Sequence, residues 1–250
     1  MAYIKLTGNL EIIWEDNILK PKQSKPLYLL IYLAYFQDWI DRDKLAFLFW
    51  PDSPDTKSKQ NLRRLIFRAK QFDFASDLEI DNQRLRWQVK SDIQIFKKAI
   101  TNKNWQQALN AYRGEFLANI QASQPASFAA WLAQERSDLK RTWQHALNEA
   151  IKSSEQNNNY QLANKYLKQL YDSEILAEDV LQRYLHNCYL LNQKSEALEI
   201  YAKFKNLLNN ELGLEPLIET TAIIEAIESS EKLEPLVSAK PLDQDLIPSS

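Results

Sequence analysis

The chain has 250 residues, 45% of them hydrophobic and 26% charged, which is the balance of a globular protein that can bury a core. Its single cysteine excludes an internal disulfide framework and any Cys-x-x-Cys metal or redox pair. The net charge of −2 is uneven: residues 1–95 have 15 Lys and Arg against 13 Asp and Glu, whereas the remainder has 16 against 20. Neither part has the basic excess of a dedicated DNA-binding domain.

The first segment, MAYIKLTGNL, lacks the basic start and apolar run of a signal peptide. No later stretch approaches the roughly eighteen apolar residues of a membrane helix. A single thiol also fits a reducing compartment. We therefore expect a cytoplasmic protein that does not contact a membrane.

Residues 3–20 predict two or three short antiparallel strands, because their apolar runs are interrupted by the turn-forming pairs Gly-Asn at 8–9 and Asp-Asn at 16–17. From Pro26 the apolar residues follow helical spacing instead. The chain therefore changes from strands to a first helix near this proline.

Two further helices are expected next. The second begins at about Asp41, which can serve as N-cap, and ends before Pro51. The third begins after Ser53 as N-cap with Pro54 at the first helical position, and extends to about Gln71. The segment LEIDNQRLRWQV (78–89) then has strand-forming residues on both sides of Asp-Asn, which predicts a hairpin. Strands, three helices and a hairpin predict an α+β winged helix-turn-helix domain over residues 1–92.

Residues 93–228 predict an all-α domain, because only helical patterns follow one another there. NYQLANKYLKQLY (159–171) and QKSEALEIYAKFK (193–205) form an internal repeat with matching positions 34 residues apart, Ala163/Ala197, Leu167/Tyr201 and Leu170/Phe204. This is the period of tetratricopeptide helix pairs, in which a small Ala lets helices approach closely. Residues 229–250 contain three prolines and little periodicity, and we expect a disordered tail or linker.

The third helix combines a packing face with a basic face. Segment 57–70 contains six basic residues and no acid. A helical wheel places one set on a packing face: Ser58, Leu62, Leu65, Ile66 and Ala69. The opposite face carries Lys57, Gln60, Arg64, Phe67, Arg68 and Gln71, with Asn61 and Arg63 on its flanks. Arg can bind guanine, Asn or Gln can bind adenine, and Lys can neutralise phosphate, so these are candidate DNA-binding residues.

The third helix of a winged helix is the one that enters the major groove, which favours DNA binding over a merely solvated basic face. Phe67 could contact a thymine methyl or pack on the wing, and we favour packing. Arg84 and Arg86 on the hairpin could reach phosphate or the minor groove, and Arg42 at the start of the second helix could bind phosphate. Each of these three arginines could equally be an ordinary exposed residue.

Four strings, in this order, give the chain a family resemblance. LAFLFWPDSPDTKSKQNLRRLIFRAK (45–70) resembles the L-x-x-L-W-P-D…N-L-R-x-x-L-x-R-x-R segment of the Streptomyces antibiotic regulatory proteins. AYRGEFL (111–117), WLAQERSDL (131–139) and ELGLEPLIET (211–220) are similar to strings of their bacterial transcriptional activator domain. The resemblance covers about residues 1–228.

The resemblance implies an OmpR-like winged helix joined to a tetratricopeptide-like domain. It also implies an activator that binds direct repeats near promoters, usually as a dimer, and recruits RNA polymerase. The wing departs from the family, because it lacks the common Gly-Tyr pair. Arg64, Phe67 and Lys70 occupy positions that vary among relatives, so the DNA sequence that is read cannot be transferred. We expect no receiver domain ahead of the winged helix, and therefore no switch by receiver phosphorylation.

Enzyme chemistry is not expected. The glycines Gly8, Gly114 and Gly213 are too sparse for a phosphate loop, and we expect no cofactor. His186 and Cys188 lie two residues apart on a predicted helix, where their side chains diverge, so we expect a buried thiol and not a metal site. Two alternatives to the DNA-reading activator stay open: an adaptor for protein interactions, and the N-terminal regulatory module of a larger NTPase-containing regulator.

Overall fold

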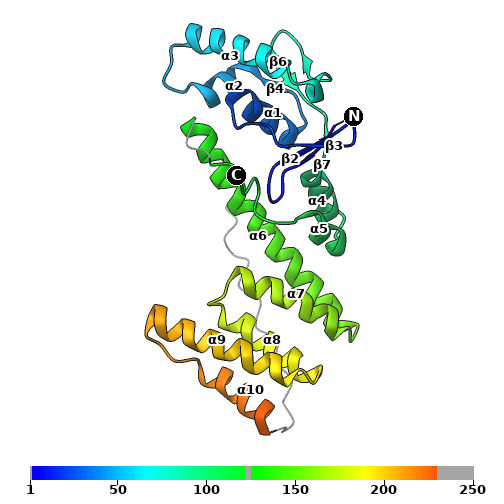
Figure 1. Ribbon diagram of the computed structural model, residues 1–250, viewed down its shortest axis with the longest axis vertical. Helices are drawn as coiled ribbons and strands as arrows, with labels where there is room; N and C mark the ends of the chain where they lie inside the picture. The colour runs from blue at the N-terminus through cyan, green and yellow to red at the C-terminus, as the bar shows by residue number, and fades with distance from the viewer. Residues whose placement is uncertain (1, 122–124, 230–250) are drawn as a thin grey trace, which may run out of the picture. The chain divides into compact units, whose positions relative to one another are not determined.

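The computed structural model describes residues 2–121 and 125–229. The chain divides into two compact units, residues 1–146 and residues 147 onward. The division lies inside helix α6 (Ala126–Gln156), which contributes to both units (Figure 1).

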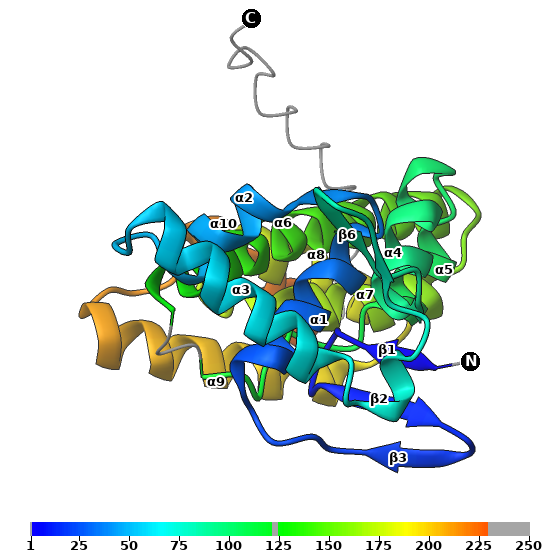
Figure 2. The same cartoon turned by 90° about the horizontal axis from the view of Figure 1, so that it is seen from above.

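The first unit begins with three short antiparallel strands, as predicted. They are β1 (Tyr3–Lys5), β2 (Glu11–Trp14) and β3 (Asn17–Leu19), and Figure 2 shows them as neighbours. Strand β7 (Lys90–Ser91) pairs with β1 in parallel and completes a sheet of order β3-β2-β1-β7. The sequence did not predict β7, because two residues are too few for an alternating pattern.

The three predicted helices are present as α1 (Lys25–Phe36), α2 (Arg42–Phe49) and α3 (Asp55–Ala69). Asp41 is the N-cap residue of α2, as predicted, although its side chain makes no capping hydrogen bond. The start of α3 differs from the prediction by one residue. Pro54 has an extended backbone with ψ of 144°, so it occupies the N-cap position that was predicted for Ser53.

The predicted hairpin is formed by β5 (Glu79–Ile80) and β6 (Arg84–Arg86). The Asp81 carboxylate accepts hydrogen bonds from the backbone N–H groups of Gln83 at 2.7 Å and Arg84 at 2.6 Å, which fixes the turn. Strand β4 (Ile40–Asp41), which was not predicted, pairs with β6. Sheets, three helices and this hairpin form a winged helix-turn-helix.

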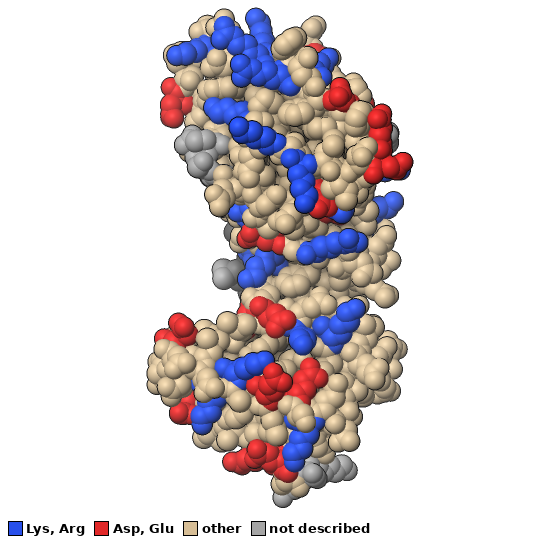
Figure 3. All heavy atoms as spheres, viewed as in Figure 1, with Lys and Arg blue, Asp and Glu red and all other residues tan. Residues whose placement is uncertain are grey.

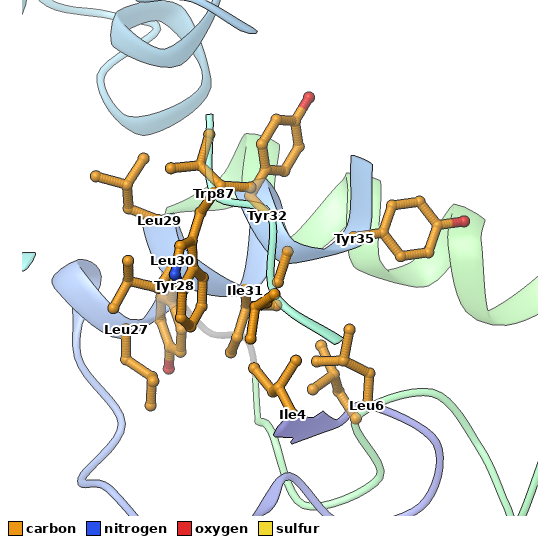
Figure 4. Packing of buried hydrophobic residues seen from close by; sticks show 14 of the residues in the cluster. Ile4, Leu6, Leu27, Tyr28, Leu29, Leu30, Ile31, Tyr32, Tyr35 and Trp87 are labelled. Atoms are coloured by element: carbon orange, nitrogen blue, oxygen red, sulfur yellow. The ribbon is translucent and has the colours of Figure 1, made fainter. Parts of the chain in front are cut away.

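The core of the first unit is built around α1, whose residues from Leu27 to Tyr35 are all buried. Ile31 points toward Ile4 and Leu6 of the N-terminal strand region in Figure 4. Burial around the whole circumference is consistent with the lack of a polar face on α1. Helix α3 and strand β6 contact α1, and aromatic rings of α6 pack on its tyrosines.

Helices beyond the predicted winged-helix boundary belong to the same hydrophobic cluster. They are α4 (Asp92–Thr101), α5 (Trp105–Ala111) and the first part of α6. Phe128 of α6 stacks on Tyr28 of α1 with ring centroids 4.8 Å apart, and Trp131 contacts Tyr32 and Tyr35. One hydrophobic cluster therefore extends from the N-terminal strand to α6. The predicted boundary after residue 92 does not coincide with the division between the compact units.

Polar contacts strengthen the same junction. The buried Asp92 carboxylate accepts hydrogen bonds from the N–H groups of Leu6, Thr7 and Ile93 and from the Thr7 hydroxyl, at 2.7–2.9 Å. The Arg136 guanidinium of α6 donates to the carbonyl oxygens of Phe116, Leu117 and Ile120, at 2.6–3.1 Å. Two family strings thus meet in space: AYRGEFL supplies carbonyl groups and WLAQERSDL supplies the arginine that binds them.

The second unit contains the last turns of α6 and helices α7 (Tyr160–Ser173), α8 (Glu178–Leu190), α9 (Lys194–Leu212) and α10 (Ile218–Ser229). The repeat positions Ala163 and Ala197 are both fully buried, on α7 and α9, and α8 packs against each of these helices. This arrangement is tetratricopeptide-like, as predicted. The expected disordered tail lies outside the described residues from 230 onward. No helix of the described parts is long and apolar enough to cross a membrane.

Candidate nucleic-acid interface

Helix α3 has the two faces that the sequence predicted. Its buried residues are those of the predicted packing face, Ser58, Leu62, Leu65, Ile66 and Ala69. Its exposed residues include Lys57, Gln60, Arg63, Arg64, Phe67 and Arg68, followed by Gln71 just beyond the helix, whereas Asn61 is half-buried. Figure 3 shows Lys and Arg side chains gathered over the end of the first unit that carries α3 in Figure 1.

The cations of this segment differ in their partners. Lys59 lies between two carboxylates, with its Nζ atom 3.1 Å from Asp43 and 3.0 Å from Asp55. The hydrogen bond to Asp55 raises the pKa of Lys59 most, and the hydrogen bond to Asp43 raises it further. The other five form no ion pair with any residue that the structure describes: Lys57, Arg63, Arg64, Arg68 and Lys70. Five of the six charges are therefore available to an anion.

The position of the Phe67 side chain differs from the sequence-based prediction. We expected its ring to pack on the wing, but 67% of the residue is exposed. This exposure agrees with the helical period, because Phe67 lies close to the direction opposite the buried Leu62, about 140° away at roughly 100° per residue. The ring thus shares a surface with Gln60, Arg64 and Gln71.

A pocket opens on one flank of α3, between this helix, the start of α2 and the hairpin turn. Its volume is about 620 Å³, and four cationic residues line it together with Asp41 and Asp43: Arg42, Lys44, Lys59 and Arg63. The hairpin contributes Asn82 and Gln83. The backbone N–H of Arg42 donates a hydrogen bond to the carbonyl oxygen of Gln83 at 2.8 Å. The Nε atom of Arg42 is buried and has no hydrogen-bond partner among the described residues.

Sequence reasoning found Arg42 and Arg63 but missed Lys44, Asn82 and Gln83. Nothing in the local pattern identifies these three, because the pairing of β4 with β6 brings them together across about 40 positions of sequence. The residues that line the pocket can therefore be named only when the pairing of β4 with β6 is known.

The two hairpin arginines already have partners. Arg86 donates two hydrogen bonds to Glu79, at 3.1 and 2.6 Å, and Arg84 lies 3.4 Å from Asp81. Both guanidinium groups also lie over the ring of Trp39: the Cζ atom of Arg86 is 4.7 Å from the ring centroid, and that of Arg84 is 5.4 Å from it. These contacts organise the hairpin and compete with any external anion.

The thiol of Cys188 lies in the second unit and is fully buried. Burial raises its pKa to about 11. The amide nitrogen of Asn164 lies 3.7 Å from the sulfur. Within residues 2–121 and 125–229 no group of three His, Cys, Asp or Glu side chains could hold a metal ion.

Comparison with known proteins identifies the family. The family model described as bacterial transcriptional activator domain matches residues 96–228, more than half of the chain. The chain belongs to the bacterial transcriptional activator domain family. Its resemblance to the Streptomyces antibiotic regulatory proteins is thereby confirmed, and the family is one of transcription regulators.

A solved structure supports the fold of this family member. The structure of Mycobacterium tuberculosis EmbR in complex with a low-affinity phosphopeptide is similar with a TM-score of 0.55 and 16% sequence identity. The match covers 93% of this chain and 66% of that chain, so this chain spans just under two thirds of the EmbR chain. A search of curated proteins found no match.

Proposed function

We propose that this transcription regulator binds double-stranded DNA in the cytoplasm and reads its sequence with α3. The observation that carries the proposal is the exposed surface of segment 57–70, the third helix of a winged helix-turn-helix with its C-cap. It presents five cations that have no ion-pair partner among the described residues, and the segment contains no acid. Two glutamines and an asparagine on or beside this face supply the groups that bind adenine.

The pocket beside α3 supports a role in backbone binding. It lies between the helix that would enter the major groove and the hairpin that would face the next groove, where a phosphate strand would pass. Arg42 and Arg63 line it, and the unpartnered Arg42 Nε atom gains a hydrogen bond if a phosphate oxygen enters. Arg84 and Arg86 would contribute through the shape of the hairpin, because their charges are already paired.

The family resemblance adds the finer proposal that the protein binds direct repeats near promoters as a dimer and recruits RNA polymerase. The helical second unit would then supply the contacts with the second protomer or the polymerase. An adaptor role without DNA reading, alone or as a module of a larger regulator, is the competing hypothesis. It is favoured by the ion-paired hairpin arginines and by the net charge of only +2 in residues 1–95.

In vitro selection from random duplex DNA with the full chain separates these hypotheses. We expect enrichment of a shared motif, and tighter binding of that duplex than of bulk DNA in fluorescence anisotropy at several salt concentrations. Arg64→Ala should weaken the selected duplex by about 5- to 150-fold, since one bidentate base contact contributes about 1–3 kcal/mol.

Arg141→Ala is the matched control, because Arg141 is an exposed arginine of the first unit that lies on α6. Its binding should equal that of the unmodified protein. Selection without any enriched motif, or equal binding by the Arg64 variant, would favour the adaptor.

A further inference from the structure

The exposed ring of Phe67 is the one apolar group at the centre of the proposed reading face. Gln60, Arg64 and Phe67 recur at intervals of four and three residues, which places them along one line of the helix, and Gln71 follows just beyond the end of α3. Arg63 and Arg68 flank this line and are also exposed. An aromatic ring that is 67% exposed therefore lies inside a cationic surface.

The positive charge around Phe67 indicates which kind of ligand could cover its ring. No acid of the described residues pairs with Arg63, Arg64 or Arg68, so the surface repels cationic partners and attracts a polyanion. Within a duplex major groove, the 5-methyl group of thymine is the apolar group that a base edge presents. A phenyl ring on a helix that enters this groove would bury that methyl group and lose its own contact with water.

We infer that Phe67 is a specificity-determining residue that recognises the 5-methyl group of a thymine in the operator. The inference rests on the proposed function. Arg64 and Phe67 are separated by about 4.5 Å along the helix axis. Successive bases are about 3.4 Å apart along the duplex. The thymine therefore lies at, or next to, the base pair that Arg64 contacts.

Replacement of thymine by deoxyuridine tests the inference, because it removes only the methyl group. The enriched duplex from the selection experiment is prepared with each thymine replaced in turn. We expect one position, or two adjacent ones, at which the unmodified protein binds about three- to tenfold more weakly. Phe67→Ala should bind the thymine duplex with about the same loss, and should no longer distinguish thymine from deoxyuridine at that position.

Phe47→Ala provides a matched control, since Phe47 is also 67% exposed but lies on α2. This variant should keep the full sensitivity to deoxyuridine. Phe67→Leu keeps an apolar side chain and should retain part of the sensitivity, which separates a lost contact from a disturbed helix.

The two proposals fail in different ways. If selection enriches no motif, the proposed function fails and the reading of thymine fails with it. If a motif is enriched but every deoxyuridine is tolerated, the inference about Phe67 is overturned while DNA reading stands. The same holds if the Phe67→Ala protein remains sensitive to deoxyuridine at the position that the unmodified protein recognises.

Discussion

Single residues on α3 and around its pocket differ sharply in how their charges are used. Lys59 is held by two carboxylates, whereas Arg64 has no ion-pair partner among the described residues. Arg42 is intermediate, since its Nε–H is buried and has no acceptor among the described residues. A buried unsatisfied donor costs about 1–3 kcal/mol, so the free protein has an energetic deficit that an incoming anion could remove.

Arg42 should therefore act on DNA affinity without acting on sequence preference. We predict that Arg42→Gln weakens binding to selected and unrelated duplexes by similar factors. It should also reduce the slope of log affinity against log salt concentration by about one, because one phosphate contact is lost. Anisotropy titrations at three or more salt concentrations measure both quantities.

The folded protein should tolerate this change, since the substitution removes a buried donor that has no partner. A loss confined to the selected duplex would instead indicate a base contact by Arg42. An unchanged salt slope would remove the pocket from the proposed interface.

Among the structural elements, α4 is attached to the N-terminal sheet by its first residue. Asp92 accepts four hydrogen bonds, three of them from Leu6 and Thr7 in the strand region. The contact is almost completely buried. The match to the family model begins at residue 96, within α4. The hydrogen bonds of Asp92 therefore join the N-terminal strand region to the helical region that follows.

Removing this carboxylate should destabilise the first unit. We predict that Asp92→Asn lowers the free energy of unfolding by about 2–4 kcal/mol, because an amide NH₂ group faces donors in place of an acceptor oxygen. Urea denaturation of the variant and the unmodified protein measures the difference. Asp138→Asn is the control, as this carboxylate lies on the helix surface, and its effect should stay within about 0.5 kcal/mol.

Elements with several turns or alternating residues were predictable from the sequence. The period of Leu27, Leu30, Ile31 and Ala34 identified α1, and Asp-Asn identified the hairpin turn. β4 and β7 were not predictable, because each has two residues and depends on a partner far away in the sequence. Local patterns do not carry that information.

The candidate site shows the same limit. The wheel separated Leu62 from Arg64 correctly, since both faces lie on one helix. The sequence could not show that Lys59 is neutralised by Asp43 of another helix, or that Glu79 and Asp81 bind the hairpin arginines. The position of Phe67 on the polar face allowed both packing on the wing and exposure, and only the structure shows that the residue is exposed.

At the scale of the whole molecule, the hydrophobic cluster around α1 continues beyond residues 1–92, which the sequence predicts as the winged helix. Phe116, Phe128 and Leu132 are fully buried members of the same cluster as Leu27 and Ile31. Tyr28 and Tyr35 of α1 contact rings from these later residues. A chain cut after residue 92 would expose these apolar surfaces to water.

Fragments of the protein test this extended core. We predict that residues 1–146 form a folded fragment with cooperative thermal unfolding. Residues 1–92 should be poorly folded or aggregate, because the covering surface of α1 is missing. Circular dichroism and size-exclusion chromatography distinguish the two outcomes. A cooperative, monomeric 1–92 fragment would show that the winged helix is an independent domain, as the sequence pattern predicted.

The buried thiol has a practical consequence when it is considered together with the aromatic residues. All seven tryptophans of the chain lie within residues 1–146, and the single cysteine lies in the second unit. Indole emission therefore reports on the first unit alone. The reaction of Cys188 with a thiol reagent reports on the opening of the second, because the native side chain is inaccessible. The unmodified protein thus contains separate optical and chemical reporters for its two halves.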